Sequence, residues 1–184
     1  MPEGDTIHKV ANWLSPRLTG HTLADVSMAD ALAASRCTGR QVDTVQAVGK
    51  HLLIDLDNDT TLRSHLGMHG SWHFYRPGDD WKRPRRQASL VLTTCDASYV
   101  CFNAKEVELM KSASVRRRIV DARLGPDLMG DAVDTDAIVR RARDIMEADV
   151  LIADVLLDQR VACGIGNVYK SEVLFIEKLA PQMV

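Results

Sequence analysis

The segment LLDQRVACGIGNVYKSEVL, residues 156–174, places a glycine-rich turn between two stretches with helical spacing. Gly164 and Gly166 interrupt the pattern, and a second helix is predicted directly after them. The start of a helix presents free backbone N–H groups, which together with the helix dipole favour an anion such as phosphate. Asn167 is placed either to cap this helix or to donate to that phosphate. The simpler alternative is an ordinary helical hairpin whose glycines provide clearance.

Helical spacing also precedes this turn. We predict three helices within residues 134–146, 148–159 and 167–178, which open with Asp, Ala-Asp and Asn at their cap positions. The glycines and proline of residues 125–130 are typical of a linker. The C-terminal part is therefore expected to form a helical domain over residues 131–184.

The N-terminus has the same periodicity. Apolar residues recur at helical spacing at Ile7, Val10, Ala11, Leu14 and Leu18. This pattern predicts a helix from Asp5, with Asp5 or Thr6 as its cap. Such a helix would keep the first residues from fraying.

Residues 20–110 have a different character. Short segments rich in β-branched and aromatic residues alternate with turn sequences, and we expect strands within residues 22–28, 41–56, 60–75, 88–95 and 97–103. Regularly spaced short strands are typical of a sandwich. The predicted fold class is α+β: an N-terminal helix plus a two-layer antiparallel β-sandwich over residues 1–122, followed by the helical domain.

The formal net charge of −2 over 184 residues gives no global indication of a nucleic-acid partner. Local charge differs, because residues 76–86 hold five basic and two acidic side chains, and residues 111–123 hold five and one. Such runs are usually solvated faces or linkers. They become informative only beside a second signal for phosphate binding.

No apolar run approaches the roughly 18–20 residues of a membrane span, and the start lacks the pattern of a secretory signal. A cytoplasmic protein is expected. The four cysteines, Cys37, Cys95, Cys101 and Cys163, form no C-x-x-C pair. We expect them to be small buried side chains rather than disulfide partners or zinc ligands.

The opening MPEG offers a nucleophile. Once Met1 is removed, Pro2 carries a secondary amine, which is more available at neutral pH than a lysine amine because α-amino groups have a reference pKa near 8. Its imine with an aldehyde is cationic and therefore acts as an electron sink. Glu3 is adjacent and suited to general acid and base work. The alternative is that Pro2 only permits removal of Met1 and that Glu3 is a surface charge.

Two further segments carry candidate residues. Lys50 stands at the head of an apolar strand, where it either closes on a phosphate or extends to solvent. His65, His69 and His73 stand four apart, but Gly67 interrupts them, so we predict a strand, a loop and a strand rather than a metal site. An unbranched apolar side chain such as Met68 at a loop tip is suited to wedge into a base stack.

The order of these motifs is more specific than any one of them. MPEG (1–4), GKHLL (49–53), HLGMHGSW (65–72), LGPDL (124–128) and residues 156–174 together resemble the formamidopyrimidine-DNA glycosylase and endonuclease VIII family, over essentially the whole chain. The PEGDT opening is more similar to the actinobacterial endonuclease VIII branch than to the purine-directed branch.

The resemblance implies a bifunctional DNA glycosylase and abasic-site lyase acting on oxidised bases, with pyrimidines favoured. It implies a catalytic set of Pro2, Glu3 and Lys50, in which Pro2 attacks C1′ of the damaged nucleotide and Glu3 shuttles protons, and β- and δ-elimination follow. The residues then expected to bind DNA are Lys50, Met68, His69, Gly166, Asn167, Arg85 and Arg86. Glu172 would support the N-terminus, and the basic run at 116–118 would add salt-dependent affinity.

The sequence also departs from the family pattern. Members usually carry a C-terminal zinc finger whose four cysteines do not occur here, so the helix-two-turn-helix domain is expected to be truncated and no cofactor is expected within this chain. A retained Met1 would turn the Pro2 amine into an amide, and Thr6 stands where members often have glutamate. The expected partner is damaged double-stranded DNA, bound by a monomer in the bacterial nucleoid. The alternative is a non-catalytic module that binds damaged DNA.

Overall fold

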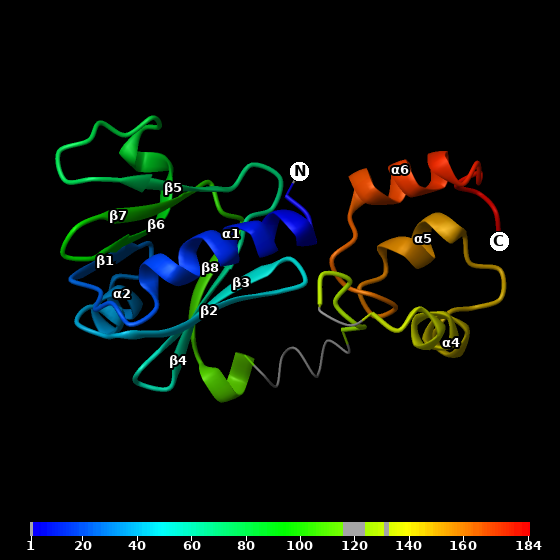
Figure 1. The fold of residues 1–184 in the computed structure, drawn as a ribbon, viewed down its shortest axis with the longest axis horizontal. Helices are drawn as coiled ribbons and strands as arrows, with labels where there is room; N and C mark the ends of the chain where they lie inside the picture. Colours follow the sequence, from blue (N-terminus) through cyan, green and yellow to red (C-terminus); the bar gives the residue numbers. More distant parts are fainter. Residues whose placement is uncertain (1, 116–123, 131–132) are drawn as a thin grey trace.

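The chain folds into a sandwich and a group of helices that meet at the start of α1 (Figure 1). The computed structural model describes residues 2–115, 124–130 and 133–184. All strands with named bounds lie in the N-terminal part, and α4, α5 and α6 lie in the C-terminal part. The predicted α+β architecture is confirmed.

Helix α1, Gly4–Leu18, directs Ile7, Ala11, Leu14 and Leu18 into the core. Its periodicity is as predicted, but the predicted cap is wrong. Glu3 occupies the cap position with an extended backbone, and no side chain caps the helix. Asp5 lies inside the first turn and pairs with Lys9 at 2.9 Å.

The strands form two antiparallel four-stranded sheets, as expected for a sandwich. One sheet has the order β1-β6-β7-β5, with β1 Asp25–Met28, β6 Ala88–Thr93, β7 Ser98–Phe102 and β5 Ser71–Tyr75. The other has the order β2-β3-β4-β8, with β2 Val42–Val48, β3 His51–Leu56, β4 Thr60–His65 and β8 Glu106–Lys111. Side chains from both sheets and α1 share one core, which includes Leu14, Leu52, Ile54, Leu62, Leu90 and Leu92.

Three elements were not expected from the sequence. Helix α2, Ala31–Cys37, lies between the strands predicted within residues 22–28 and 41–56, and the Asp30 carboxylate caps it by accepting from the Ala33 amide at 3.0 Å. Strand β8 completes the second sheet by pairing with β4. A third short element, the 3-10 helix η1, Arg85–Gln87, precedes β6.

In the helical part, α4 spans Thr135–Ile145 and is capped by Asp134 as predicted, through the Ala137 amide at 2.9 Å. Helix α5, Ile152–Leu157, starts later than predicted and has no side-chain cap, so the Ala148-Asp149 cap is wrong. Helix α6, Asn167–Ile176, has Gly166 at its cap position, so Asn167 is not the cap.

The segment predicted to be a linker is packed. Gly125 donates to the Gln159 carbonyl, and the Cys163 amide donates to the Pro126 carbonyl, both at 2.9 Å. A Cβ on Gly125 would collide with the Val161 carbonyl. Residues 124–130 are therefore held against the turn that precedes α6, because only glycine permits this close approach.

The cysteines are free thiols, and Cys37, Cys101 and Cys163 are buried as expected. Cys95 is exposed, which corrects the expectation for that residue. Burial raises the pKa of the Cys101 thiol to about 12, so it behaves as a small apolar side chain. No helix among the described residues is long and apolar enough to cross a membrane.

The contact between α1 and Gly164 yields a prediction. A glycine-to-alanine substitution in a helix normally stabilises the folded protein by up to about 1 kcal/mol. In Gly4→Ala the new Cβ would lie 2.8 Å from the Cα of Gly164, so we expect a loss of roughly 1–3 kcal/mol. Urea unfolding measures this loss, with Asn12→Ala on the exposed face of α1 as the control. A Gly4→Ala protein as stable as the parent would show that this contact is not close in solution.

Candidate active site

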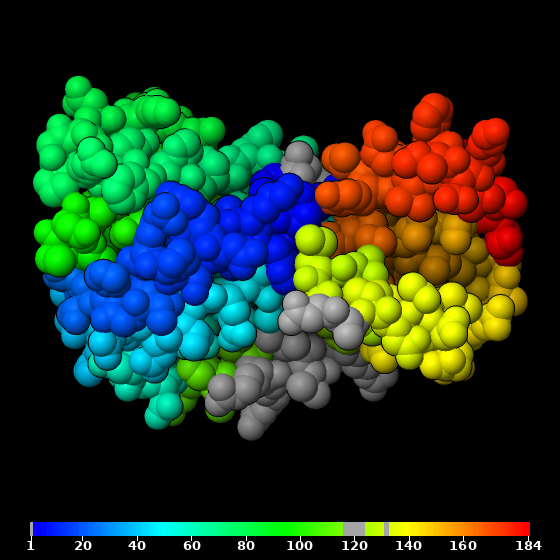
Figure 2. Space-filling model, viewed as in Figure 1, coloured from blue at the N-terminus to red at the C-terminus, as the bar shows by residue number. Residues whose placement is uncertain are grey.

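The first residues of the chain are held between the two parts of the molecule. The Gly4 amide donates to the Gly164 carbonyl at 2.9 Å. In the space-filling view the start of α1 touches the segment around residues 160–170 at this junction (Figure 2). The N-terminus therefore does not fray, and Pro2 has a defined position.

The Glu3 side chain is the most heavily bonded group at the junction. It is 2% exposed. One carboxylate oxygen accepts from the amides of Gly166 at 2.9 Å and Tyr169 at 3.2 Å, and the other accepts from the Val168 amide at 2.8 Å. A carboxylate at the start of a helix is stabilised by free amides and by the helix dipole.

This arrangement corrects one sequence prediction. The amides at the start of α6 were expected to hold a phosphate, but in the structure the Glu3 carboxylate occupies those of Gly166, Val168 and Tyr169. Asn167 is exposed, and its side-chain oxygen accepts from Lys170 at 3.1 Å. An anion does bind this helix start, but it belongs to the protein itself.

Lys50 lies in the two-residue turn between β2 and β3, at the head of the strand as predicted. Burial lowers the pKa of the Lys50 ammonium below its ordinary value, while Glu3 and Cys163 oppose that shift. The catalytic candidates Glu3 and Lys50 are thus electrostatic neighbours, although 46 residues separate them in the chain numbering.

A cleft of about 800 Å³ opens beside Pro2. It is lined by Pro2, Lys50, His65, Leu66, Gly67, Met68, His69, Asn103 and Lys105. Four of the predicted site residues, Pro2, Lys50, Met68 and His69, therefore share one surface. The cleft combines the N-terminus, cationic side chains and an apolar tip.

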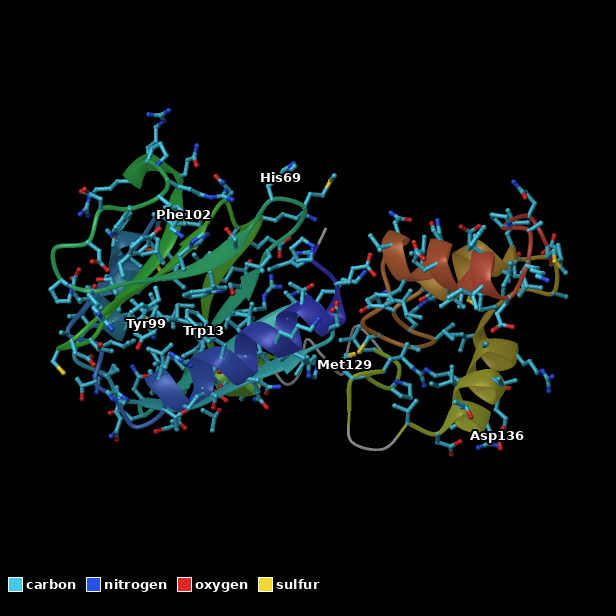
Figure 3. The ribbon with its side chains drawn as sticks, turned by 45° about the horizontal axis from the view of Figure 1, so that its top comes forward. Trp13, His69, Tyr99, Phe102, Met129 and Asp136 are labelled. Atoms are coloured by element: carbon cyan, nitrogen blue, oxygen red, sulfur yellow. The ribbon has the colours of Figure 1, made fainter. Side chains whose placement is uncertain are left out.

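The β4–β5 loop forms one wall of this cleft. Met68 is 67% exposed, and His69 projects at the tip of the loop (Figure 3). Gly67 has φ 63°, and a Cβ there would lie 2.8 Å from the Cβ of Lys105. This loop and the β7–β8 loop are therefore packed tightly, which leaves Met68 exposed at the tip.

Asn103 and Lys105 were missed by the sequence reasoning. Asn103 has φ 49°, a left-handed conformation that asparagine tolerates better than most residues. A β-turn signal at Asn103-Ala104 was available in the sequence, but nothing in the chain order indicated that this turn faces Lys50.

A charged cluster lies beneath the cleft on the outer face of the second sheet. Arg63 contacts His51 at 2.8 Å and pairs with Glu106 at 2.6 Å and Glu108 at 3.3 Å. The ring centroids of His51 and His65 are 5.0 Å apart. Burial, helped by the Arg63 charge, lowers the pKa of His51 to about 4.

This pKa shift has a measurable consequence. His51 is neutral in the folded protein, so protonation at low pH favours the unfolded chain, and stability falls as the pH drops from 6.5 toward about 4. In His51→Asn, whose amide oxygen can still accept from Arg63, we expect this loss to shrink by on the order of 2 kcal/mol. Thermal unfolding across this pH range measures it, with exposed His21→Asn as the control. Identical pH profiles for parent and His51→Asn would contradict the prediction.

Other predicted residues lie elsewhere. Arg85 stacks on the Trp81 ring at 4.3 Å and lines a separate cavity on the outer face of the first sheet, and Arg86 is exposed beside it. Glu172 is exposed on α6. Residues 116–118 lie outside the described residues. The structure therefore does not bring Arg85 into the cleft.

The histidines of the β4–β5 region do not gather around one point. His65 lies against His51, whereas His73 bonds to Ser71 at 2.9 Å and packs edge-on against Phe102. Across residues 2–115, 124–130 and 133–184 no group of three or more His, Cys, Asp or Glu side chains is arranged to hold a metal ion.

Two family models match the chain. The formamidopyrimidine-DNA glycosylase N-terminal domain matches residues 1–105, and the formamidopyrimidine-DNA glycosylase H2TH domain matches residues 124–184. The chain therefore belongs to the formamidopyrimidine-DNA glycosylase family, and the expected helix-two-turn-helix domain is confirmed.

The curated relatives carry endonuclease VIII names. The chain is 37% identical over 185 residues to "Probable endonuclease 8 2" of Streptomyces coelicolor, covering 98% of this chain and 65% of the relative. It is 29% identical over 178 residues to "Endonuclease 8" of Escherichia coli O1:K1 / APEC, covering 95% of this chain and 67% of that relative. The resemblance to actinobacterial endonuclease VIII is confirmed, and the chain spans about two thirds of the length of these relatives.

Solved structures share the fold. Lactococcus lactis Fpg in complex with DNA containing N7-benzyl-Fapy-dG has a TM-score of 0.85 at 21% identity, covering 98% of this chain and 69% of that one. MutM in complex with DNA containing carbocyclic 8-oxo-G has a TM-score of 0.83 at 21% identity, covering 98% and 71%. At this identity the likeness concerns the fold.

The Glu3 contacts predict an effect on stability. Glu3→Gln replaces one acceptor oxygen with an NH₂ group, which cannot accept from an amide, and removes the charge at the helix start. We expect a loss of about 1–3 kcal/mol of unfolding free energy. Glu177→Gln at the opposite end of α6 is the matched control and should be nearly neutral. Equal stability of the two variants would show that the Glu3 carboxylate does not hold α6.

Proposed function

We propose that the protein is a DNA glycosylase that removes oxidised bases, with pyrimidines favoured, and then cleaves the abasic site. The observation that carries the proposal is that Pro2, Lys50 and Met68 line one cleft in a chain of the formamidopyrimidine-DNA glycosylase family. A nucleophile, a cation and a wedge are what excision of a base from a duplex requires.

The proposed reaction begins at the free amine of Pro2. Its nitrogen forms a bond to C1′ of the damaged nucleotide, while the bond from C1′ to the base breaks and the base leaves with the electron pair and a proton. The nitrogen loses its own proton, and its lone pair then forms the C=N bond while the C1′–O4′ bond breaks and O4′ takes up a proton, which gives the open-chain cationic imine. Loss of a C2′ proton to a general base feeds electrons into this imine and breaks the C3′–O bond. A second elimination breaks the C5′–O bond, and water then hydrolyses the imine and restores the amine.

Lys50 is the proposed phosphate ligand beside the lesion. Its ammonium lies on the cleft, half-buried and near Glu3. A phosphate in this part of the cleft would pair with the ammonium. Because burial lowers the pKa of Lys50, its affinity for phosphate is expected to fall at a lower pH than that of a solvent-exposed lysine.

Met68 is the proposed wedge, with His69 beside it as a further DNA contact. Chemistry at C1′ requires the nucleotide to leave the stack, and an apolar side chain can fill the gap that remains. The exposure of Met68 in free solvent, at 67%, supports this role, because an apolar side chain is otherwise better placed in a core.

Glu3 is the proposed proton shuttle, since it directly follows Pro2 in the chain. Both of its oxygens accept amides of α6 in this structure. A carboxylate offers about four acceptor sites and the three amides use three of them, so the oxygen that accepts from Val168 keeps a site for the substrate proton. We propose a monomer acting on damaged double-stranded DNA of the bacterial nucleoid, with the Asn167 side chain as a further backbone contact.

Covalent trapping tests this function. The protein is incubated with an oligonucleotide that contains one abasic site, borohydride is added, and the adduct is measured by intact mass. We expect an adduct on protein that lacks Met1. A form with a residue fused permanently before Pro2 has an amide in place of the amine, and its trapping rate should fall by roughly 100-fold or more.

Pro77→Gly is the matched control, because Pro77 lies by the separate cavity on the first sheet, and it should trap at the parental rate. Trapping that persists with Pro2 blocked would rule out the proposed nucleophile. Lesion-selective binding without any adduct, with Met1 confirmed absent, would instead favour the alternative of a non-catalytic module that binds damaged DNA.

A further inference from the structure

Asp127 joins three segments that are far apart in the sequence. One oxygen of its carboxylate accepts from the Gly49 amide at 2.8 Å and faces the His8 ring nitrogen Nε2 at 3.2 Å. The other oxygen accepts from the Met129 amide at 3.0 Å. Met129 lies at the junction between the sandwich and the helices (Figure 3). The carboxylate therefore connects α1, the β2–β3 turn and the segment 124–130.

Gly49, whose amide donates to Asp127, directly precedes Lys50 in the chain. Val48 pairs with His51, so Gly49 and Lys50 alone form the turn of the hairpin. Gly49 has φ 55°, and a Cβ there would lie 3.3 Å from the Cys163 Sγ atom. The turn is therefore seated against the helical part, and its amide is satisfied from there by Asp127.

The helical part itself holds Asp127 in place. The Cys163 amide donates to the Pro126 carbonyl at 2.9 Å, and the Leu128 amide donates to the Cys163 carbonyl at 3.2 Å. Cys163 directly precedes Gly164, whose carbonyl accepts the Gly4 amide. Residues on both sides of Asp127 are thus anchored to the turn that also fixes the N-terminus.

We propose that Asp127 is a positioning residue for Lys50: its hydrogen bond to the Gly49 amide fixes the β2–β3 turn so that the Lys50 ammonium lies in the cleft beside Pro2. The four-carbon stem of a lysine is flexible. The space that the Lys50 ammonium can reach is therefore set by the position of the Lys50 Cα. The consequence for catalysis rests on the proposed function, but the position of Lys50 can be measured on the free protein.

Asp127→Asn tests the contact with little change in shape. An amide has one acceptor atom where the carboxylate has two, so it cannot accept from Gly49 and Met129 with different atoms. One of these two contacts must be lost. The matched control is Asp134→Asn, which removes a capping carboxylate of α4 in the same helical part but does not touch the turn.

The first measurement is competitive labelling of amines with acetic anhydride over a pH series, with the Lys50 peptide read by mass spectrometry. Release of the turn should expose Lys50 and remove the burial that lowers its pKa. We expect the labelling midpoint to move upward, toward the ordinary 10.5, in Asp127→Asn and to stay in place in Asp134→Asn. An unchanged Lys50 midpoint in a folded Asp127→Ala protein, which keeps neither acceptor oxygen, overturns the inference.

A second variant covers the case in which Asp127→Asn does not fold. Asp127→Glu keeps the charge but displaces the oxygens by one methylene, and it should shift the Lys50 midpoint in the same direction. A folded Asp127→Glu protein with the parental midpoint would overturn the inference as well.

Borohydride trapping then separates this inference from the proposed function. Asp127→Asn should slow trapping by roughly 10- to 100-fold, and the same change should have little further effect in a Lys50→Met background. If Asp127→Asn slowed trapping equally in the Lys50→Met background, the inference would be overturned, because Asp127 would then act independently of Lys50. A parental protein that traps nothing would contradict the proposed function, while the labelling result would still decide whether Asp127 positions Lys50.

Discussion

The arrangement of this protein depends on one buried carboxylate. Glu3 is 2% exposed and accepts three backbone amides at the start of α6. A carboxylate taken out of water is costly unless charge-assisted hydrogen bonds replace its hydration. Because α6 provides those bonds and Glu3 is the third residue of the chain, the N-terminus and the helical part must stay together. This contact requires glycine at position 166, because a Cβ there would lie 2.5 Å from a Glu3 oxygen.

The same carboxylate changes how the helix start is understood. A glycine turn before a helix is a general anion site, and here an internal anion fills it. The cationic side of the site is Lys50, which lies near Glu3 and lines the cleft. The amides of Gly166, Val168 and Tyr169 are therefore already bonded within the protein, whereas Lys50 faces the cleft.

The cleft exists because antiparallel strands bring distant turns to one end of the sandwich. His51 pairs with His65, His65 pairs with Glu106, and Ser71 pairs with Phe102. The turn that holds Lys50, the loop that holds Met68 and the loop that holds Lys105 lie next to these pairs. The register of the strands, rather than any local signal, places the three loops together.

Much of this could be predicted from residue patterns. Apolar spacing determined α1 and the strand character of residues 41–75, because burial of one face requires that periodicity. The chemistry of Pro2, Lys50 and Met68 made them candidates, and the order of the motifs, through the family resemblance, gave them their expected roles. The tertiary structure alone decided what caps α6, that residues 124–130 are packed, that Asn103 and Lys105 line the cleft, and that Asp127 contacts the turn before Lys50. These depend on contacts between segments as far apart as Gly49 and Asp127 or Glu3 and Gly166, and no local pattern encodes which distant amide a carboxylate will meet.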